Sequence, residues 1–71
     1  MVASSVRLSN ADFFLARAEQ ARVEAEAATL DHVRDRCRRS EAAWTALADR
    51  AQRAEHFRAL EQERKAAQPP A

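Results

Sequence analysis

Residues 10–54 read NADFFLARAEQARVEAEAATLDHVRDRCRRSEAAWTALADRAQRA, and small or apolar side chains recur in them at steps of three and four. That spacing places side chains along one side of an α-helix. The recurrence runs through two segments with a short break between them. In the first segment the positions are Ala11, Phe14, Ala18, Ala21, Ala25 and Ala28. In the second they are Val33, Cys37, Ser40, Trp44, Leu47, Ala51 and Ala54. The pattern predicts an all-α chain folded as an antiparallel two-helix hairpin.

Three signals mark the start of the first helix. Ser9 is a candidate N-cap and is followed three residues later by Asp12, as in a capping box. Leu8 and Phe13 flank this cap at the spacing of a hydrophobic staple. We therefore expect the first helix to begin at about Asn10.

The remaining boundaries follow from the break and from the two prolines at the C-terminus. We expect helices over residues 10–28 and 31–66, with the turn at residues 29–30. Residues 1–8 are expected to form a flexible arm, and residues 68–71 a disordered tail.

The break itself contains neither Gly nor Pro, so one continuous helix is the alternative to a hairpin. Residue size favours the hairpin, because a fold at Leu30 sets the bulky Trp44 opposite a small residue. The facing pairs would be Phe14 with Leu47, Ala18 with Trp44, Ala21 with Ser40 and Ala25 with Cys37.

Composition limits the possible classes of protein. The 71 residues include no Gly and carry a formal net charge of +1, which gives no general attraction to nucleic acid or to acidic membranes. No run approaches the roughly 20 apolar residues that span a bilayer, and the first residues lack the apolar core of a signal peptide. A single cysteine excludes an internal disulfide. We expect a cytoplasmic protein with no membrane partner.

Few large apolar side chains are available to close the hairpin, so we expect association to complete it. The second helix is longer than the first. Its last third carries Phe57 and Leu60, and the first helix is too short to lie opposite them. These two residues, with Phe13 and Leu15, are the candidates for a second interface. The expected partner is a second copy, in a four-helix bundle or coiled coil, or another helical protein.

Few residues are candidates for metal binding or catalysis. His32, Cys37 and His56 match no zinc spacing, and no nucleophile, base and acid can be grouped. Cys37 is interpreted as a small core residue, and both histidines as exposed. We expect no metal, no cofactor and no enzymatic activity.

A basic stripe on the second helix supports an alternative function in nucleic-acid binding or regulation. Its members recur near one angle of the helix and are Arg39, Arg50, Arg53 and Arg64. Against this reading, several carboxylates lie three or four residues from an arginine, the spacing at which side chains meet on a helix. A solvent-exposed face of ion pairs is therefore the simpler interpretation. Those pairs are Asp31 with Arg34, Asp35 with Arg38 or Arg39, and Asp49 with Arg53.

The chain also resembles a group of short hypothetical proteins of alphaproteobacteria, over about residues 12–55. The shared features are DFFLARAEQAR at residues 12–22, Ala28-Thr29 at the break, Val33-Arg34, and SEAAWTALA at residues 40–48. Members open with an Asp, an aromatic and an Arg-Ala-Glu run and resume after the break with an aromatic-x-x-Leu-Ala repeat. The group often has Asp-Pro at positions 30–31, and His and Leu in place of Cys37 and Ser40. The resemblance implies a helical hairpin in a bacterial cytoplasm and adds no mechanism.

Overall fold

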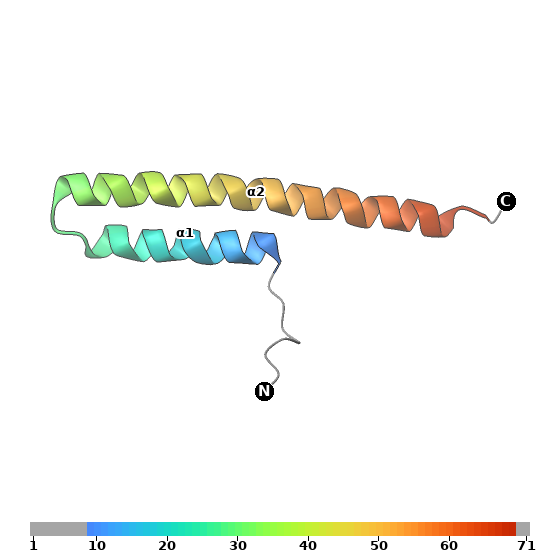
Figure 1. Cartoon of the computed structure of the whole chain (residues 1–71), viewed down its shortest axis with the longest axis horizontal. Coiled ribbons are helices and arrows are strands. Elements are labelled where there is room, and N and C mark those ends of the chain that lie inside the picture. The colour runs from blue at the N-terminus through green and yellow to red at the C-terminus, as the bar shows by residue number, and fades with distance from the viewer. Residues whose placement is uncertain (1–8, 70–71) are drawn as a thin grey trace, which may run out of the picture.

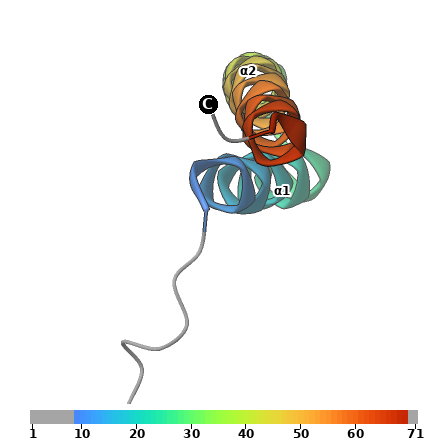
Figure 2. The ribbon, with the colours of Figure 1, turned by 90° about the vertical axis from the view of Figure 1, so that its right-hand side faces the viewer.

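The computed structural model describes residues 9–69 and has two helices, α1 (Asn10–Ala27) and α2 (Asp31–Ala67). The helices run antiparallel, side by side in a single layer (Figures 1 and 2). The described residues contain no strand, which confirms the all-α hairpin. The continuous-helix alternative is wrong. Predictions for residues 1–8 and for residues 70–71 lie outside the described part of the chain.

The start of α1 is the predicted one. The Oγ of Ser9 accepts a hydrogen bond from the backbone N–H of Asp12 at 3.1 Å, and the Ser9 carbonyl accepts from the N–H of Phe13 at 3.0 Å. Ser9 is extended, with φ −71° and ψ 165°, as an N-cap residue is. Leu8, the outer half of the predicted staple, precedes the described residues.

The turn lies where the break in the sequence predicted it, with an unpredicted stabilising contact. Leu30 stands at the N-cap of α2 but offers no side-chain hydrogen bond to the helix. Arg34 supplies the missing polar contacts from inside α2. Its guanidinium donates to the carbonyl of Ala28 at 2.9 Å and to Asp31 Oδ1 at 3.1 Å. One arginine therefore ties the end of α1 to the first turn of α2.

The helices differ twofold in length. At 1.5 Å per residue, the 18 residues of α1 span about 27 Å and the 37 residues of α2 about 55 Å. Every residue from 56 to 67 is exposed, and we call these twelve residues the overhang. Figure 1 shows α2 continuing past the start of α1. Arg64 and Lys65 lie in the last turn, where positive charge is favourable to the helix dipole.

The interior of the hairpin is built from small residues. Among residues 9–69 the buried ones are Ala11, Ala18, Ala21, Ala25, Cys37 and Ala48. Ala25 and Ala48 have no exposed surface at all. Alanine on both helices lets the backbones approach closely, since no long side chain separates them. All four buried residues of α1 belong to its predicted line.

The predicted line of α2 is only half right. Val33, Cys37, Trp44 and Ala51 are buried or half-buried, whereas Ser40, Leu47 and Ala54 are exposed. Ala48 takes the place of Leu47 against α1. Close packing of the alanines explains this choice, because a leucine at the centre would hold the two helices apart. Phe14, which was predicted to lie opposite Leu47, stacks on Trp44.

Candidate interaction surface

Two lines of residues run along α2 on different sides of the helix. The first faces α1 and is buried or half-buried throughout. Its members are Val33, Cys37, Glu41, Trp44, Ala48, Ala51 and Glu55. The second, which we call the outer seam, also advances by steps of three and four, yet all of it is exposed. Its members are Ser40, Ala43, Leu47, Arg50, Ala54, Phe57, Glu61 and Arg64.

The line that the sequence predicted for α2 contains residues from both of these lines. It took Cys37, Trp44 and Ala51 from the line that faces α1, and Ser40, Leu47 and Ala54 from the outer seam. The predicted line ended at Ala54 and did not include Phe57, which shares the outer seam with Leu47. The 3-4 spacing of Ala43, Leu47, Ala54 and Phe57 within the seam was present in the sequence and could have revealed a second contact line.

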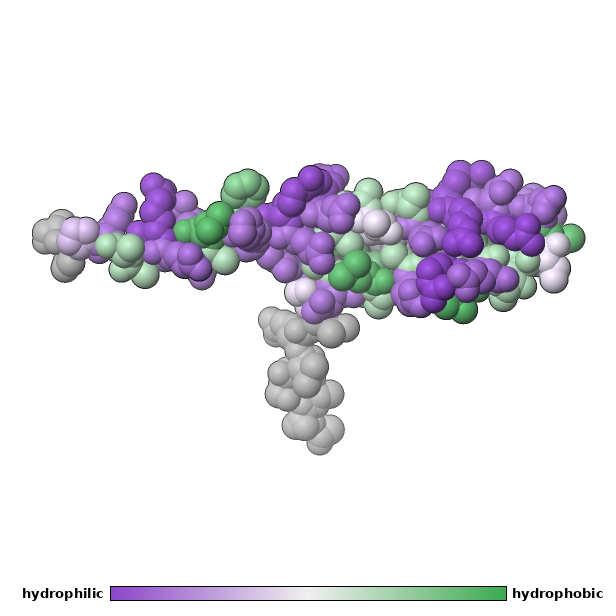
Figure 3. Space-filling model, turned by 180° about the vertical axis from the view of Figure 1, so that it is seen from behind, coloured by the Kyte–Doolittle hydropathy of each residue, from purple (hydrophilic) through white to green (hydrophobic). Residues whose placement is uncertain are grey.

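Most of the large apolar side chains lie on the surface. Phe57 is the most exposed at 68 %, followed by Leu30 at 55 %. The others that are more than a third exposed are Phe13, Leu15, Val23, Leu47 and Leu60. Figure 3 shows hydrophobic surface on the free end of α2, bordered by hydrophilic surface. Among residues 9–69 the buried side chains are thus small, and every large apolar side chain is half-buried or exposed.

The four predicted interface residues, Phe13, Leu15, Phe57 and Leu60, are all exposed, and the structure does not gather them into one patch. Phe57 and Leu60 lie on the overhang. Phe13 lies beside Trp44, with ring centroids 6.0 Å apart. Leu15 shares its side of α1 with the charged Glu19 and Arg22, four and seven residues further along.

An aromatic cluster joins the two helices at the N-terminal end of α1. The ring of Trp44 stacks on Phe14 at 5.8 Å and meets Phe13 edge-on. The guanidinium of Arg17 lies 5.3 Å from the centre of the Trp44 ring, within the range of a cation–π contact. Trp44 and Phe14 are half-buried and Phe13 is half-exposed, so the cluster presents an apolar edge to solvent.

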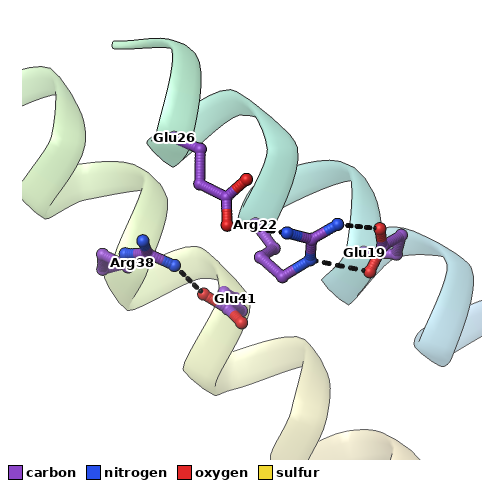
Figure 4. Close-up of polar contacts among 5 residues, drawn as sticks. All are labelled: Glu19, Arg22, Glu26, Arg38 and Glu41. Carbon is purple, nitrogen blue, oxygen red and sulfur yellow. Dashed lines mark hydrogen bonds and ion pairs between the residues drawn. The ribbon is translucent and has the colours of Figure 1, made fainter. Parts of the chain in front are cut away.

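The charged side chains pair within each helix. Figure 4 shows Arg22 between Glu19 and Glu26 on α1, and Arg38 with Glu41 on α2. Arg22 bonds Glu26 at 2.7 Å, and its Nε bonds Glu19 at 2.9 Å. The hydrogen bond from Arg22 holds the pKa of Glu19 below its usual value of 4.5. Hydrogen bonds to the two carboxylates, Glu19 first, raise the pKa of Arg22.

Among residues 9–69 no ion pair joins α1 to α2, so charge does not determine how the helices pair. The predicted pair of Asp31 and Arg34 forms at 3.1 Å. The predicted pairs of Asp35 and Asp49 do not, and Arg38 bonds Glu41 instead.

The basic stripe is exposed along its whole length and points away from α1. Arg64 bonds Glu61 at 2.5 Å, while Arg39, Arg50 and Arg53 have no carboxylate partner within residues 9–69. Phe57 lies among the last three arginines, because residues 50, 53, 57 and 64 follow the same side of the helix. The stripe and the outer seam therefore overlap on one surface.

The side chains considered for metal binding or nucleophilic chemistry are His32, Cys37 and His56. Cys37 is buried on the α1-facing line, as interpreted, and His32 and His56 are exposed. No three side chains of the His, Cys, Asp or Glu type come together to hold a metal within residues 9–69. Shallow depressions lie on the surface beside His56 and beside Trp44. Neither helix, over the described range, has the length and apolarity needed to cross a membrane.

A comparison with protein-family models, curated proteins and solved structures finds no match to this chain. The resemblance to the alphaproteobacterial group therefore remains a prediction.

Proposed function

We propose that this chain is a small, non-enzymatic interaction module that binds another helix, from a second copy or from another helical protein, along the side of α2 that α1 leaves uncovered. The observation that carries the proposal is the distribution of side-chain size. Among residues 9–69, five alanines and a cysteine are buried, while seven large apolar side chains are exposed. Exposed apolar surface of this kind marks interaction sites, because leaving it in water loses the free energy of its burial.

The charged residues around the outer seam resemble the polar edge of a protein–protein interface rather than a recognition site. Most charged residues along α2 are exposed, as at the edge of protein interfaces, and Glu61 and Arg64 of the seam pair with each other within the helix. They keep the module soluble and add little to affinity. A cytoplasmic location belongs to this proposal, since the single cysteine is unpaired and buried.

A photo-crosslinking experiment tests the proposal. The full chain would carry p-benzoylphenylalanine at position 57 and be irradiated in the cells in which it naturally occurs. We expect a covalent link to a protein, mapped by mass spectrometry to a helical peptide. The same group at Val23, which is 49 % exposed on α1, is the matched control. Links to nucleic acid, or no more product than at position 23, would overturn the proposal.

Nucleic-acid binding through Arg39, Arg50, Arg53 and Arg64 is the second candidate, because three of these side chains have no carboxylate partner in the described residues. It ranks lower because the charges of the hairpin are mixed in sign. α2 carries nine basic and seven acidic residues, and α1 carries twice as many carboxylates as arginines. Phosphate binding needs a surface of one sign and weakens steeply with salt.

A gel-shift titration with mixed-sequence DNA and RNA separates the two candidates. We expect no duplex binding tighter than about 10 μM near physiological salt, which is the weak non-specific range. Submicromolar binding that is lost in Arg50→Ala/Arg53→Ala, with unchanged helical circular dichroism, would make the basic stripe the functional surface.

A further inference from the structure

From the outer seam we infer that the occupant of this surface is a second copy of the chain, whose α2 packs antiparallel against the first with the two-fold axis at residue 52. The inference rests on the proposed function and specifies its partner. It follows from the order of residues in the seam, from their exposure and from the area available.

The seam is complementary to the seam of a second copy only when the two helices run antiparallel. Its eight positions are symmetric about residue 52, so an antiparallel second copy pairs each position with another. The pairs are Leu47 with Phe57, Arg50 with Ala54, Ala43 with Glu61 and Ser40 with Arg64. The large apolar residues face each other, and every charged residue faces a small one, which leaves room for its long side chain to reach solvent.

Other arrangements lose this match. A parallel pair in register would place Arg50, Glu61 and Arg64 each against its own copy, which repels like charges at three of eight positions. An antiparallel pair moved by one heptad would set Leu47 against Arg50 or Arg64. The register centred on residue 52 is the one that brings Leu47 and Phe57 together.

This register also covers the overhang. Residue 67 of one copy lies opposite residue 37 of the other, so 31 residues of each α2 overlap over about 46 Å. Leu60, beside the seam, then lies against Ala46 of the second copy. The overhang of each copy thus packs on the other copy's α2, along the part that is also in contact with α1. The dimer is therefore a four-helix assembly.

The area indicates a weak, reversible dimer. A strip about 46 Å long and about 11 Å wide buries roughly 500 Å² per copy and 1,000 Å² in total. This value lies at the lower limit for a specific interface, so we expect a dissociation constant in the micromolar range. Arg50 and Arg53 of both copies approach the axis, and salt should therefore tighten the dimer several-fold by screening them.

Sedimentation velocity on the full chain from about 1 to 500 μM measures the association. We expect a monomer–dimer equilibrium in which Phe57→Ala raises the dissociation constant about 100-fold, because the contact with Leu47 occurs twice in a symmetric dimer. Leu15→Ala is the matched control, since Leu15 is exposed on the charged side of α1, and should leave the constant unchanged. A monomer over the whole range would overturn the inference, as would equal effects of the two variants.

Disulfide trapping tests the register. Ala43 and Glu61 are exposed and face each other across the dimer, but within one α2 they lie about 27 Å apart, beyond the reach of a disulfide. In a Cys37→Ala background, Ala43→Cys/Glu61→Cys should oxidise to a covalent dimer, and neither single variant should. Dimers from the single variants would indicate a parallel pair and overturn the register.

The crosslink from position 57 distinguishes failure of this inference from failure of the proposed function. A link from residue 57 to a peptide containing Leu47 of a second copy supports both. A link to a different helical protein, with a monomer in sedimentation, supports the interaction module and overturns the second copy as its partner. The absence of any protein link overturns both.

Discussion

The part of α2 that lies on α1 and the overhang are helical for different reasons. Up to Glu55, α2 has residues covered by α1 and shares the aromatic cluster with it. From residue 56 to residue 69 every residue is exposed, yet the helix continues to Ala67. Good helix formers and the Glu61–Arg64 pair support this second part. The comparison shows that intrinsic propensity determines where this helix runs, whereas small side chains determine where it packs.

Trp44→Ala should produce the largest loss of stability, because it removes the main contact between the two helices. The ring is half-buried against Phe14, Phe13 and Arg17, so we expect a loss of about 3 kcal/mol in the free energy of unfolding. Urea unfolding at low micromolar concentration measures it. Leu60→Ala, on the overhang, should cost less than about 0.5 kcal/mol under these conditions. Equal losses would mean that the overhang is packed as tightly as the paired part.

Ala48→Leu should come next, at about 2 kcal/mol. Ala48 has no exposed surface, and a larger side chain there would push the helices apart. Ala59→Leu makes the same substitution at an exposed position of the overhang, eleven residues further along α2. It should change the free energy of unfolding by less than about 0.5 kcal/mol. If Ala48→Leu were tolerated as well, close packing of alanines would not explain why Leu47 is turned outward.

The same comparison shows what the sequence could and could not predict. Ser9, the break after Ala28 and the alanine line of α1 have local signatures, and the structure confirms them. On α2, Leu47 and Ala48 are adjacent and both fit a 3-4 pattern with Trp44. Choosing between them requires knowing how closely the helices approach, which is a property of the pair. The partner of the exposed surface could not be predicted from the apolar spacing of the sequence, because a second copy and a foreign helix both need such a stripe.

Arg34→Ala should have a smaller effect, confined to the turn. It removes the hydrogen bond to the Ala28 carbonyl and the contact with Asp31, and the guanidinium is partly exposed. We expect a loss of about 1 kcal/mol, measured by thermal unfolding at fixed protein concentration. Arg36→Ala, two residues further along, removes an exposed arginine without a carboxylate partner in residues 9–69 and should change stability by less than about 0.5 kcal/mol. An equal loss in both would show that net charge, rather than the tie across the turn, is responsible.

The smallest effect concerns Glu19, on the outer side of the paired region. Its pKa lies below the usual 4.5 because Arg22 donates hydrogen bonds to the carboxylate. A carboxylate with a lowered pKa in the folded state favours folding above the unfolded-state value, and this contribution is lost as the pH falls through the folded-state value. Stability should therefore fall slightly on acidification below about pH 4.5, and less so in Arg22→Ala.

A titration of the Glu19 carboxyl by nuclear magnetic resonance measures this directly. Its pKa should rise toward 4.5 in Arg22→Ala and stay low in Arg36→Ala, which alters a distant exposed arginine on α2. High salt should shrink the difference, because both groups are accessible to solvent. A pKa that stays low without Arg22 would assign the shift to the helix itself. The ion pairs of α1 would then be a consequence of its regular spacing and not a contribution to the fold.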